Sequence, residues 1–358
     1  MADKNITLRQ KNTSGVYDKL YTKTTATQSK LSTATATLFG EGISDADAAL
    51  AKIADTVKSI GNVQVKVVDP NGNPIQGARV TGLYGTPTTA SDGTAHGVLQ
   101  TNPISISSPY IDLKDQTADA SGYVGSFNVL VVTLPVVGEN SITRITSSKT
   151  VKFSKAVKTV DVCCVGGGGA GGGLSQMVYN GVFGGGGGGG ITNSMGVIPQ
   201  FAKSYSIIVG SGGTYNHSSN GSSGGTSSFG NLVTASGGKG GSLRTGGTAG
   251  AVGCGNGGGN GNGQSNTTIS EFGDNLTFYS GGGGSGSTGY TVPSGGSPNG
   301  ASGSIMQHGG INAGSAGIGG GGGGASGLAN DSYNPSYWSY QANGSSGGPG
   351  LVAIRFHF

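Results

Sequence analysis

Charge and long apolar runs are scarce in this sequence. Only 10% of its 358 residues are Asp, Glu, Lys or Arg, and the formal net charge is +4. Nucleic-acid binding requires clustered Lys and Arg, so we expect no nucleic-acid partner. No apolar run reaches the roughly 18 residues of a membrane helix, and none follows the first residues. We therefore expect no membrane span and no signal peptide, and a chain made in a cytoplasm.

Cysteine is also rare, and its spacing excludes two kinds of site. Cys163 and Cys164 are adjacent, while Cys254 lies far along the chain. Adjacent residues of a strand point to opposite faces, so this pair does not form part of a disulfide framework or a zinc site. We expect three reduced thiols and no metal.

Acidic residues nearly disappear from the second half of the chain. After Asp161 the acids are Glu271, Asp274 and Asp331, and the four histidines of the chain are well separated. Catalytic dyads, triads and glycosidase carboxylate pairs need such groups in proximity. This scarcity of acids disfavours a depolymerase of cell-wall polysaccharides, and we expect no enzyme and no cofactor.

Glycine is abundant in the same half. Of the 76 glycines, 13 precede Asp161 and 63 follow it. Glycine has the largest entropy to lose on ordering, so disorder is one interpretation. Apolar residues, however, interrupt the glycine runs too often for a flexible linker. Chains without side chains can pack as extended helices of three residues per turn, so we predict short strands with packed polyglycine-II helices.

The segment Gly166 to Gly171 imitates a dinucleotide-binding loop. Gly166, Gly168 and Gly171 fit G-x-G-x-x-G directly after an apolar strand. The loop must open a helix, but seven glycines occupy 184–190, and no acid follows about 20 residues on to bind a ribose. We exclude nucleotide binding.

Residues 1–61 form the first predicted region, an N-terminal attachment segment with an amphipathic helix over 43–60. Six apolar residues of this helix alternate in spacings of three and four: Ile43, Ala46, Leu50, Ile53, Val57 and Ile60. This pattern is that of a coiled-coil seam. Two interpretations stay open, a helix that lies on the next domain of its own chain and a short coiled coil that sets an oligomer.

Residues 62–140 change to a period of two. Val63, Val65 and Val67 alternate with polar residues, a glycine-containing turn follows at 69–74, and a late strand is expected over 127–134. The order of these motifs resembles the transthyretin-like β-sandwich modules that serve as spacers. The resemblance implies a small structural sandwich.

Residues 150–358 resemble the glycine-rich domain at the C-terminus of phage tail and baseplate proteins. The resemblance rests on the entry strand Thr159 to Val165, the run "YSIIVGSGG" from Tyr205, the turn "SSFG" and the closing "GLVAIRF". The composition is also similar to that of phage tip adhesins. Near the N-terminus, "YDKLYTKT" from Tyr17 resembles the "YDxLYPKT" run of tail proteins, with Thr22 in place of proline.

These resemblances imply a mainly β protein of the virion tail that binds a receptor on the host surface. The implied partners are other tail or baseplate proteins, a host cell-wall polysaccharide or surface protein, and two further copies in a homotrimer. The alternative is a purely structural tail or baseplate component with no receptor contact.

Aromatic side chains in the glycine-poor interruptions are the predicted receptor contacts. Aromatic faces bury a large area at low entropy cost and are enriched in binding hot spots. The alternative is that these rings cap the ends of the glycine helices. The candidate residues are Tyr333, Tyr337, Trp338, Tyr340, Tyr279, Tyr290, Tyr215 and His217.

Overall fold

The structure is a computed structural model that describes residues 7–11, 17–21, 53, 61–173, 181–274, 277–305, 311–329 and 338–358. Over these ranges the chain is mainly β, as predicted. The predicted helix 43–60 is not supported, because Ile53 is its only described residue. The remaining seam residues Ile43, Ala46, Leu50, Val57 and Ile60 lie outside the described residues.

An antiparallel hairpin occurs near the N-terminus. Strand β1 (Thr7–Lys11) pairs with β2 (Tyr17–Tyr21), so that Thr7 lies opposite Tyr21. The tail-like "YDKLY" run is therefore a strand, which the sequence pattern did not predict.

The chain divides into two compact units. Unit 1 comprises Met1–Pro109 and Lys114–Pro135, and unit 2 comprises Tyr110–Leu113 and Val136–Phe358. The chain enters unit 2 for the second time at Val136. The next two strands, β9 (Ile142–Ile145) and β10 (Lys149–Val151), both pair within unit 2.

Unit 1 contains two three-stranded sheets. Its elements are β3 (Asn62–Val68), β4 (Arg79–Thr81), β5 (Thr94–Val98), β6 (Ile104–Ser107), β7 (Gln116–Ala118), the 3-10 turn η2 (Ser121–Tyr123) and β8 (Leu130–Thr133). The sheet orders are β5-β3-β8 and β4-β6-β7, and β3 is parallel only to β8.

The predicted period of two is confirmed in β3. Val63, Val65 and Val67 are fully buried, while the residues between them are exposed. The strand predicted over 127–134 is shorter in the structure, where β8 covers only Leu130–Thr133. Phe127 lies before it and is 96% exposed.

Unit 2 begins with two four-stranded antiparallel sheets. Their strands, besides β9 and β10, are β11 (Thr159–Val165), β13 (Ile191–Val197), β14 (Tyr205–Ile208), β15 (Ser227–Phe229), β16 (Val233–Ala235) and β19 (Leu351–His357). The orders are β13-β11-β19-β9 and β10-β14-β15-β16. Both sheets contribute to one core, in which Tyr205 stacks on Phe229 with 5.1 Å between ring centroids. The predicted entry strand, β11, and the predicted closing strand, β19, pair with each other in antiparallel orientation.

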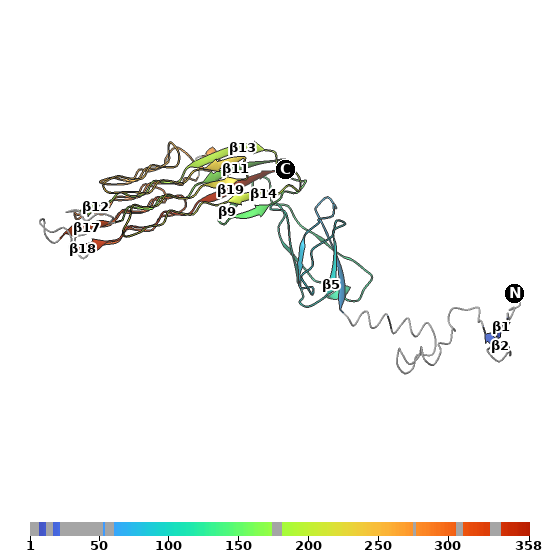
Figure 1. The fold of residues 1–358 in the computed structure, drawn as a ribbon. Coiled ribbons are helices and arrows are strands. Elements are labelled where there is room, and N and C mark those ends of the chain that lie inside the picture. The colour runs from blue at the N-terminus through green and yellow to red at the C-terminus, as the bar shows by residue number, and fades with distance from the viewer. Residues whose placement is uncertain are drawn as a thin grey trace. The chain divides into compact units, whose positions relative to one another are not determined.

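A third sheet lies at the far end of unit 2 (Figure 1). Its strands are β12 (Gly181–Val182), β17 (Ser326–Ala329) and β18 (Trp338–Ala342), in the order β12-β17-β18. A short 3-10 turn, η3 (Glu271–Gly273), lies away from this end, against β11 and β13.

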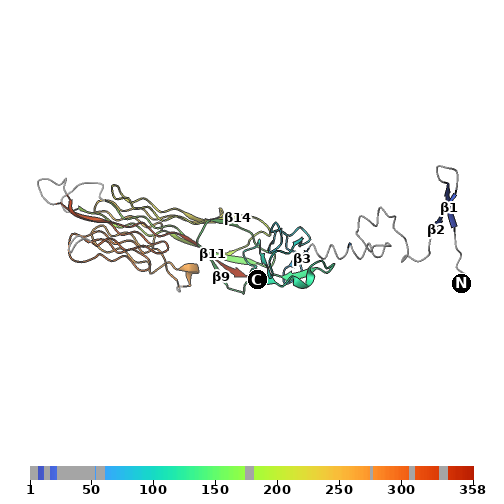
Figure 2. The ribbon, with the colours of Figure 1, turned by 90° about the horizontal axis from the view of Figure 1, so that it is seen from below.

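Glycine-rich segments run side by side between the two sheet regions of unit 2 (Figures 1 and 2). We call them the glycine lattice, and they comprise residues 166–173, 183–190, 210–214, 221–226, 236–242, 245–250, 255–258, 261–266, 280–287, 293–304, 313–326 and 343–350. Backbone hydrogen bonds between different segments hold the lattice together.

The hydrogen bonds of the lattice repeat every three residues. In segment 166–173, one N–H in three donates to residues 184–190, the next to 219–225 and the third to 345–348, at 2.8–3.0 Å. The carbonyls of the same segment accept from three other segments. A buried segment therefore has six neighbours, and its peptide groups are paired without a regular helix or sheet ladder.

Only glycine fits at the close contacts of the lattice. A Cβ on Gly168 would lie 1.9 Å from the carbonyl oxygen of Gly320, and one on Gly186 would lie 2.0 Å from that of Gly169. These are backbone atoms that no rotamer change moves away.

Polar side chains complete the hydrogen bonding at one edge of the lattice. Asn262 Oδ1 accepts from the N–H of Ser294, and three residues further on Ser265 Oγ accepts from the N–H of Ser297, both at 2.9 Å. We call this pair of contacts the edge ladder. The two side-chain oxygens accept hydrogen bonds from backbone N–H groups. Inside the lattice, such N–H groups donate to the carbonyls of a neighbouring segment instead.

We predict that Gly186→Ala destabilises unit 2 by roughly 3 kcal/mol, since overpacking against backbone forces the segments apart. Gly261→Ala is the matched control, because a Cβ there meets nothing within 4 Å. Thermal denaturation of both variants tests this, and equal melting temperatures would contradict the lattice packing.

Candidate binding surface

The lattice brings four described chain reversals to one end of unit 2. Hydrogen-bond registers show that consecutive segments are antiparallel, for example 184–190 against 166–173 and 221–226 against 210–214. We call this end, which also carries β12, β17 and β18, the turn end (Figure 1). Its described reversals occupy residues 215–220, 243–244, 259–261 and 288–292.

Three of the predicted contacts lie in described parts of these reversals. Tyr215 is half-buried against the small cluster of Phe183 and Ala325, and its N–H donates to Ser346 Oγ at 3.0 Å. His217 Nδ1 lies 3.1 Å from Asn343 Oδ1 and is exposed. Tyr290 is 70% exposed. The turn end therefore combines one anchored ring with exposed polar and aromatic groups.

The densest predicted cluster is described only in part. Trp338 and Tyr340 lie on β18, where they pair with Ala329 and Leu328 of β17. Tyr333 and Tyr337 lie outside the described residues. Topology thus brings the strand carrying Trp338 and Tyr340 to the same end as Tyr215, His217 and Tyr290.

Tyr279 does not belong to this surface. It is 6% exposed, packs in a core cluster with Cys163 and Leu351, and its hydroxyl lies 3.3 Å from Glu271 Oε2. It directly precedes segment 280–287, at the end of the lattice away from the turns. We correct the expectation of a receptor contact here, because a buried ring offers no face to a ligand.

Arg244 is a turn-end residue that the sequence reasoning did not single out. It lies in the tight reversal between Ser242 and Thr245, is exposed, and has a φ of +53°. Its signal in the sequence was one arginine within a nearly uncharged stretch.

The acids of unit 2 that the structure describes serve structural contacts. Arg144 contacts Glu271 at 2.7 Å, and Glu271 is 2% exposed. Asp112 accepts hydrogen bonds from the N–H and hydroxyl of Ser154, and burial raises the pKa of Asp112. These arrangements hold segments together and present no open cleft.

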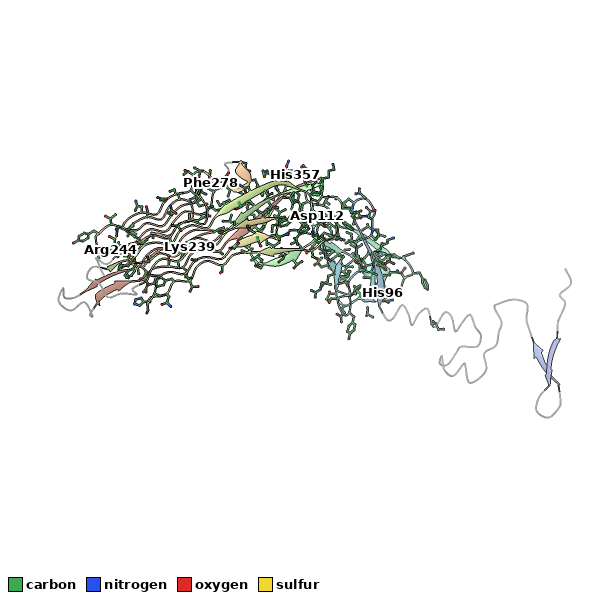
Figure 3. The ribbon with its side chains drawn as sticks, turned by 45° about the horizontal axis from the view of Figure 1, so that its top comes forward. His96, Asp112, Lys239, Arg244, Phe278 and His357 are labelled. Carbon is green, nitrogen blue, oxygen red and sulfur yellow. The ribbon has the colours of Figure 1, made fainter. Side chains whose placement is uncertain are left out.

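A charged cluster lies at the C-terminal end of strand β19, around His357, which is labelled in Figure 3. His357 lies 2.9 Å from Glu139 through Nδ1 and 2.9 Å from Asp161 through Nε2, and Arg355 pairs with Asp161 at 2.9 Å. Hydrogen bonds to Asp161 and Glu139 raise the pKa of His357. Burial raises the pKa of Asp161, but bonds from His357, Gly196 and Arg355 outweigh it and leave that pKa below its usual value.

The described residues contain neither a cluster of metal ligands nor a helix that could span a membrane. Among them, no three His, Cys, Asp or Glu side chains gather as metal ligands. Equally, no described helix has the length and apolarity needed to cross a bilayer. The three cysteines are free and buried, and burial raises the pKa of the Cys163 and Cys164 thiols to about 12.

We predict that the His357 cluster makes unit 2 less stable as pH rises. Because the folded pKa of His357 is raised, its stabilisation is complete below the unfolded pKa and is lost as pH rises through the folded one. The His357 contribution to the melting temperature of the full chain should therefore fall as pH rises above the ordinary histidine pKa of about 6.5.

The variant His357→Gln isolates this contribution from the other histidines. The difference in melting temperature between the two proteins should shrink as pH rises over the same range. A difference that is constant with pH would show that His357 does not titrate with folding.

Comparison with known proteins agrees with the extent of unit 2. A family model described as a glycine-rich domain matches residues 143–357, which is more than half of the chain. The match begins in β9 and ends in β19, so it includes both four-stranded sheets and the lattice. No curated protein shows significant sequence similarity to the chain. The chain therefore belongs to the glycine-rich domain family.

Proposed function

We propose that the chain is a non-enzymatic phage tail receptor-binding protein that contacts the host bacterial surface through its turn end. The observation that carries this proposal is the repeated return of the lattice to one end, where Tyr215, His217, Tyr290 and β18 come together. Binding residues are commonly carried on loops that a rigid scaffold positions.

The lattice is the scaffold in this proposal. Its three-residue hydrogen-bond period supports packed polyglycine-II helices, in which the missing side chain permits close approach. Such a body is held by main-chain bonds and carries few charges. Its turns are then displayed on a support that their own side chains do not have to stabilise.

The other regions of the chain have supporting roles in the proposal. Residues 1–61 attach to other tail or baseplate proteins, and the sheets of unit 1 form a transthyretin-like spacer. The seam of Ile43, Ile53 and Ile60 sets a homotrimer. The protein is made in the host cytoplasm and is located in the virion tail.

A purely structural tail component is the second candidate. One observation favours it, since Tyr215 packs against Phe183 and Ala325 and so closes the end of the lattice. In that case the aromatic residues serve as apolar caps, and the turn end contacts no receptor.

Cell binding separates the two candidates. We expect the labelled full-length protein to decorate intact susceptible cells and to slow phage adsorption. A protein that assembles into tails but neither binds cells nor competes with phage would support the structural role instead.

Exposed tyrosines provide a matched pair of variants. Tyr290→Ala should weaken cell binding several-fold without lowering the melting temperature, because large rings dominate binding energies. Tyr84→Ala is the control, since Tyr84 is 72% exposed in unit 1 and Tyr290 is 70% exposed at the turn end. If the two variants bind cells equally well, Tyr290 does not contact the receptor.

The trimer is tested separately by the mass of the intact chain in solution. We expect three copies at micromolar concentration and dissociation on Ile53→Asp, because a charge within an apolar seam is costly. A monomer at that concentration would contradict the seam interpretation.

A further inference from the structure

We infer that the turn end binds an oxyanion, a phosphate or a carboxylate on a surface polymer, through Arg244. This inference rests on the proposed function and names the chemistry of its ligand. It begins from the backbone of one reversal in the lattice.

The reversal that carries Arg244 is held from several sides. The N–H of Ser242 donates to the carbonyl of Thr245 at 2.9 Å, and the N–H of Thr245 donates back at 3.2 Å. The N–H of Arg244 itself donates to the carbonyl of Val182 at 3.0 Å, and Leu243 packs on the cluster of Phe183. The position of the arginine backbone is therefore defined by the fold.

The backbone at Arg244 is in a region that disfavours its own side chain. Its φ of +53° is left-handed, where a residue with a Cβ is less stable than glycine by about 1 kcal/mol. Among the described residues, twelve glycines and seven other residues, Arg244 included, adopt positive φ, so glycine is the commoner residue at such positions. Arginine at this position therefore makes the fold less stable than glycine would. Its backbone makes the same hydrogen bonds in the turn that a glycine backbone would make.

The charge of Arg244 has no ion-pair partner among the described residues. Arg355 pairs with Asp161 and Asp274 near the C-terminus, and the third acid after Asp161, Asp331, lies outside the described residues. Lys239 is exposed on the flank of the lattice, away from the turn end (Figure 3). Arg244 is the only described base in the reversals.

Neighbouring polar groups suit an oxyanion. The reversal 259–261 runs beside Arg244, because a Cβ on Gly259 would lie 2.9 Å from the Arg244 carbonyl oxygen. It carries the exposed Asn260, which adds an amide donor to the same end. A guanidinium binds carboxylate and phosphate through two parallel hydrogen bonds, and few nearby charges compete with it.

Immobilised polymers test this inference with the full-length protein. The probes are poly(glycerol phosphate) for phosphodiesters, polygalacturonate for carboxylates and dextran as the neutral reference. We expect the wild type to bind one anionic polymer above dextran at physiological salt. The polymer that binds distinguishes the two sources of oxyanion.

The decisive variants are Arg244→Gly and Lys239→Gln. Arg244→Gly should lose roughly tenfold in binding, the scale of a charged hydrogen bond, with a melting temperature equal to or above the wild type. Lys239→Gln removes the same charge from the lattice flank and should bind as the wild type does. The inference is overturned by binding to neither anionic polymer, by full binding of Arg244→Gly, by an equal loss in both variants, or by a lower melting temperature of Arg244→Gly.

Cell binding keeps this inference distinct from the proposed function. If the wild type and Arg244→Gly decorate susceptible cells equally, receptor binding stands and the role of Arg244 fails. If the wild type decorates no susceptible cells, the proposed function fails, and the polymer assay alone decides whether Arg244 binds an oxyanion.

Discussion

The approach of one main chain to another, without side chains between them, is the contact on which unit 2 depends. Where Gly168 faces Gly320, an added methyl group would lie 1.9 Å from a carbonyl oxygen, far inside van der Waals contact. The energy that usually comes from buried apolar side chains is here supplemented by dense backbone pairing in three directions. The apolar core is confined to the sheets next to the lattice, around Phe153, Phe229 and Phe356.

This construction separates two kinds of chemistry along unit 2. Ion pairs such as Arg355 with Asp161 and Arg144 with Glu271 lie among the sheets, where they join strands distant in sequence. The turn end contains amides, hydroxyls, aromatic rings and Arg244. The ion pairs and the exposed residues of the turn end are therefore different sets of side chains at opposite ends of unit 2.

Sequence patterns predicted the elements that side chains encode. Alternating valines predicted β3, and the resemblance to the glycine-rich domain predicted β11 with its bounds. The neighbours of each glycine segment were not predictable, because a residue without a side chain carries no pattern of partners. The burial of Tyr279 and the reversal at Arg244 depend on those neighbours, so the candidate site was predicted only where aromatic residues interrupted the glycine runs.

The edge ladder has a consequence for molecules held close together. An unfinished lattice, like an unpaired sheet edge, presents main-chain donors that a second chain could satisfy. At the outer segments, Asn262 and Ser265 already occupy such donors on Ser294 and Ser297. These short side chains end the growth of the lattice at the boundary of one molecule, and so oppose its extension into a fibre of many copies.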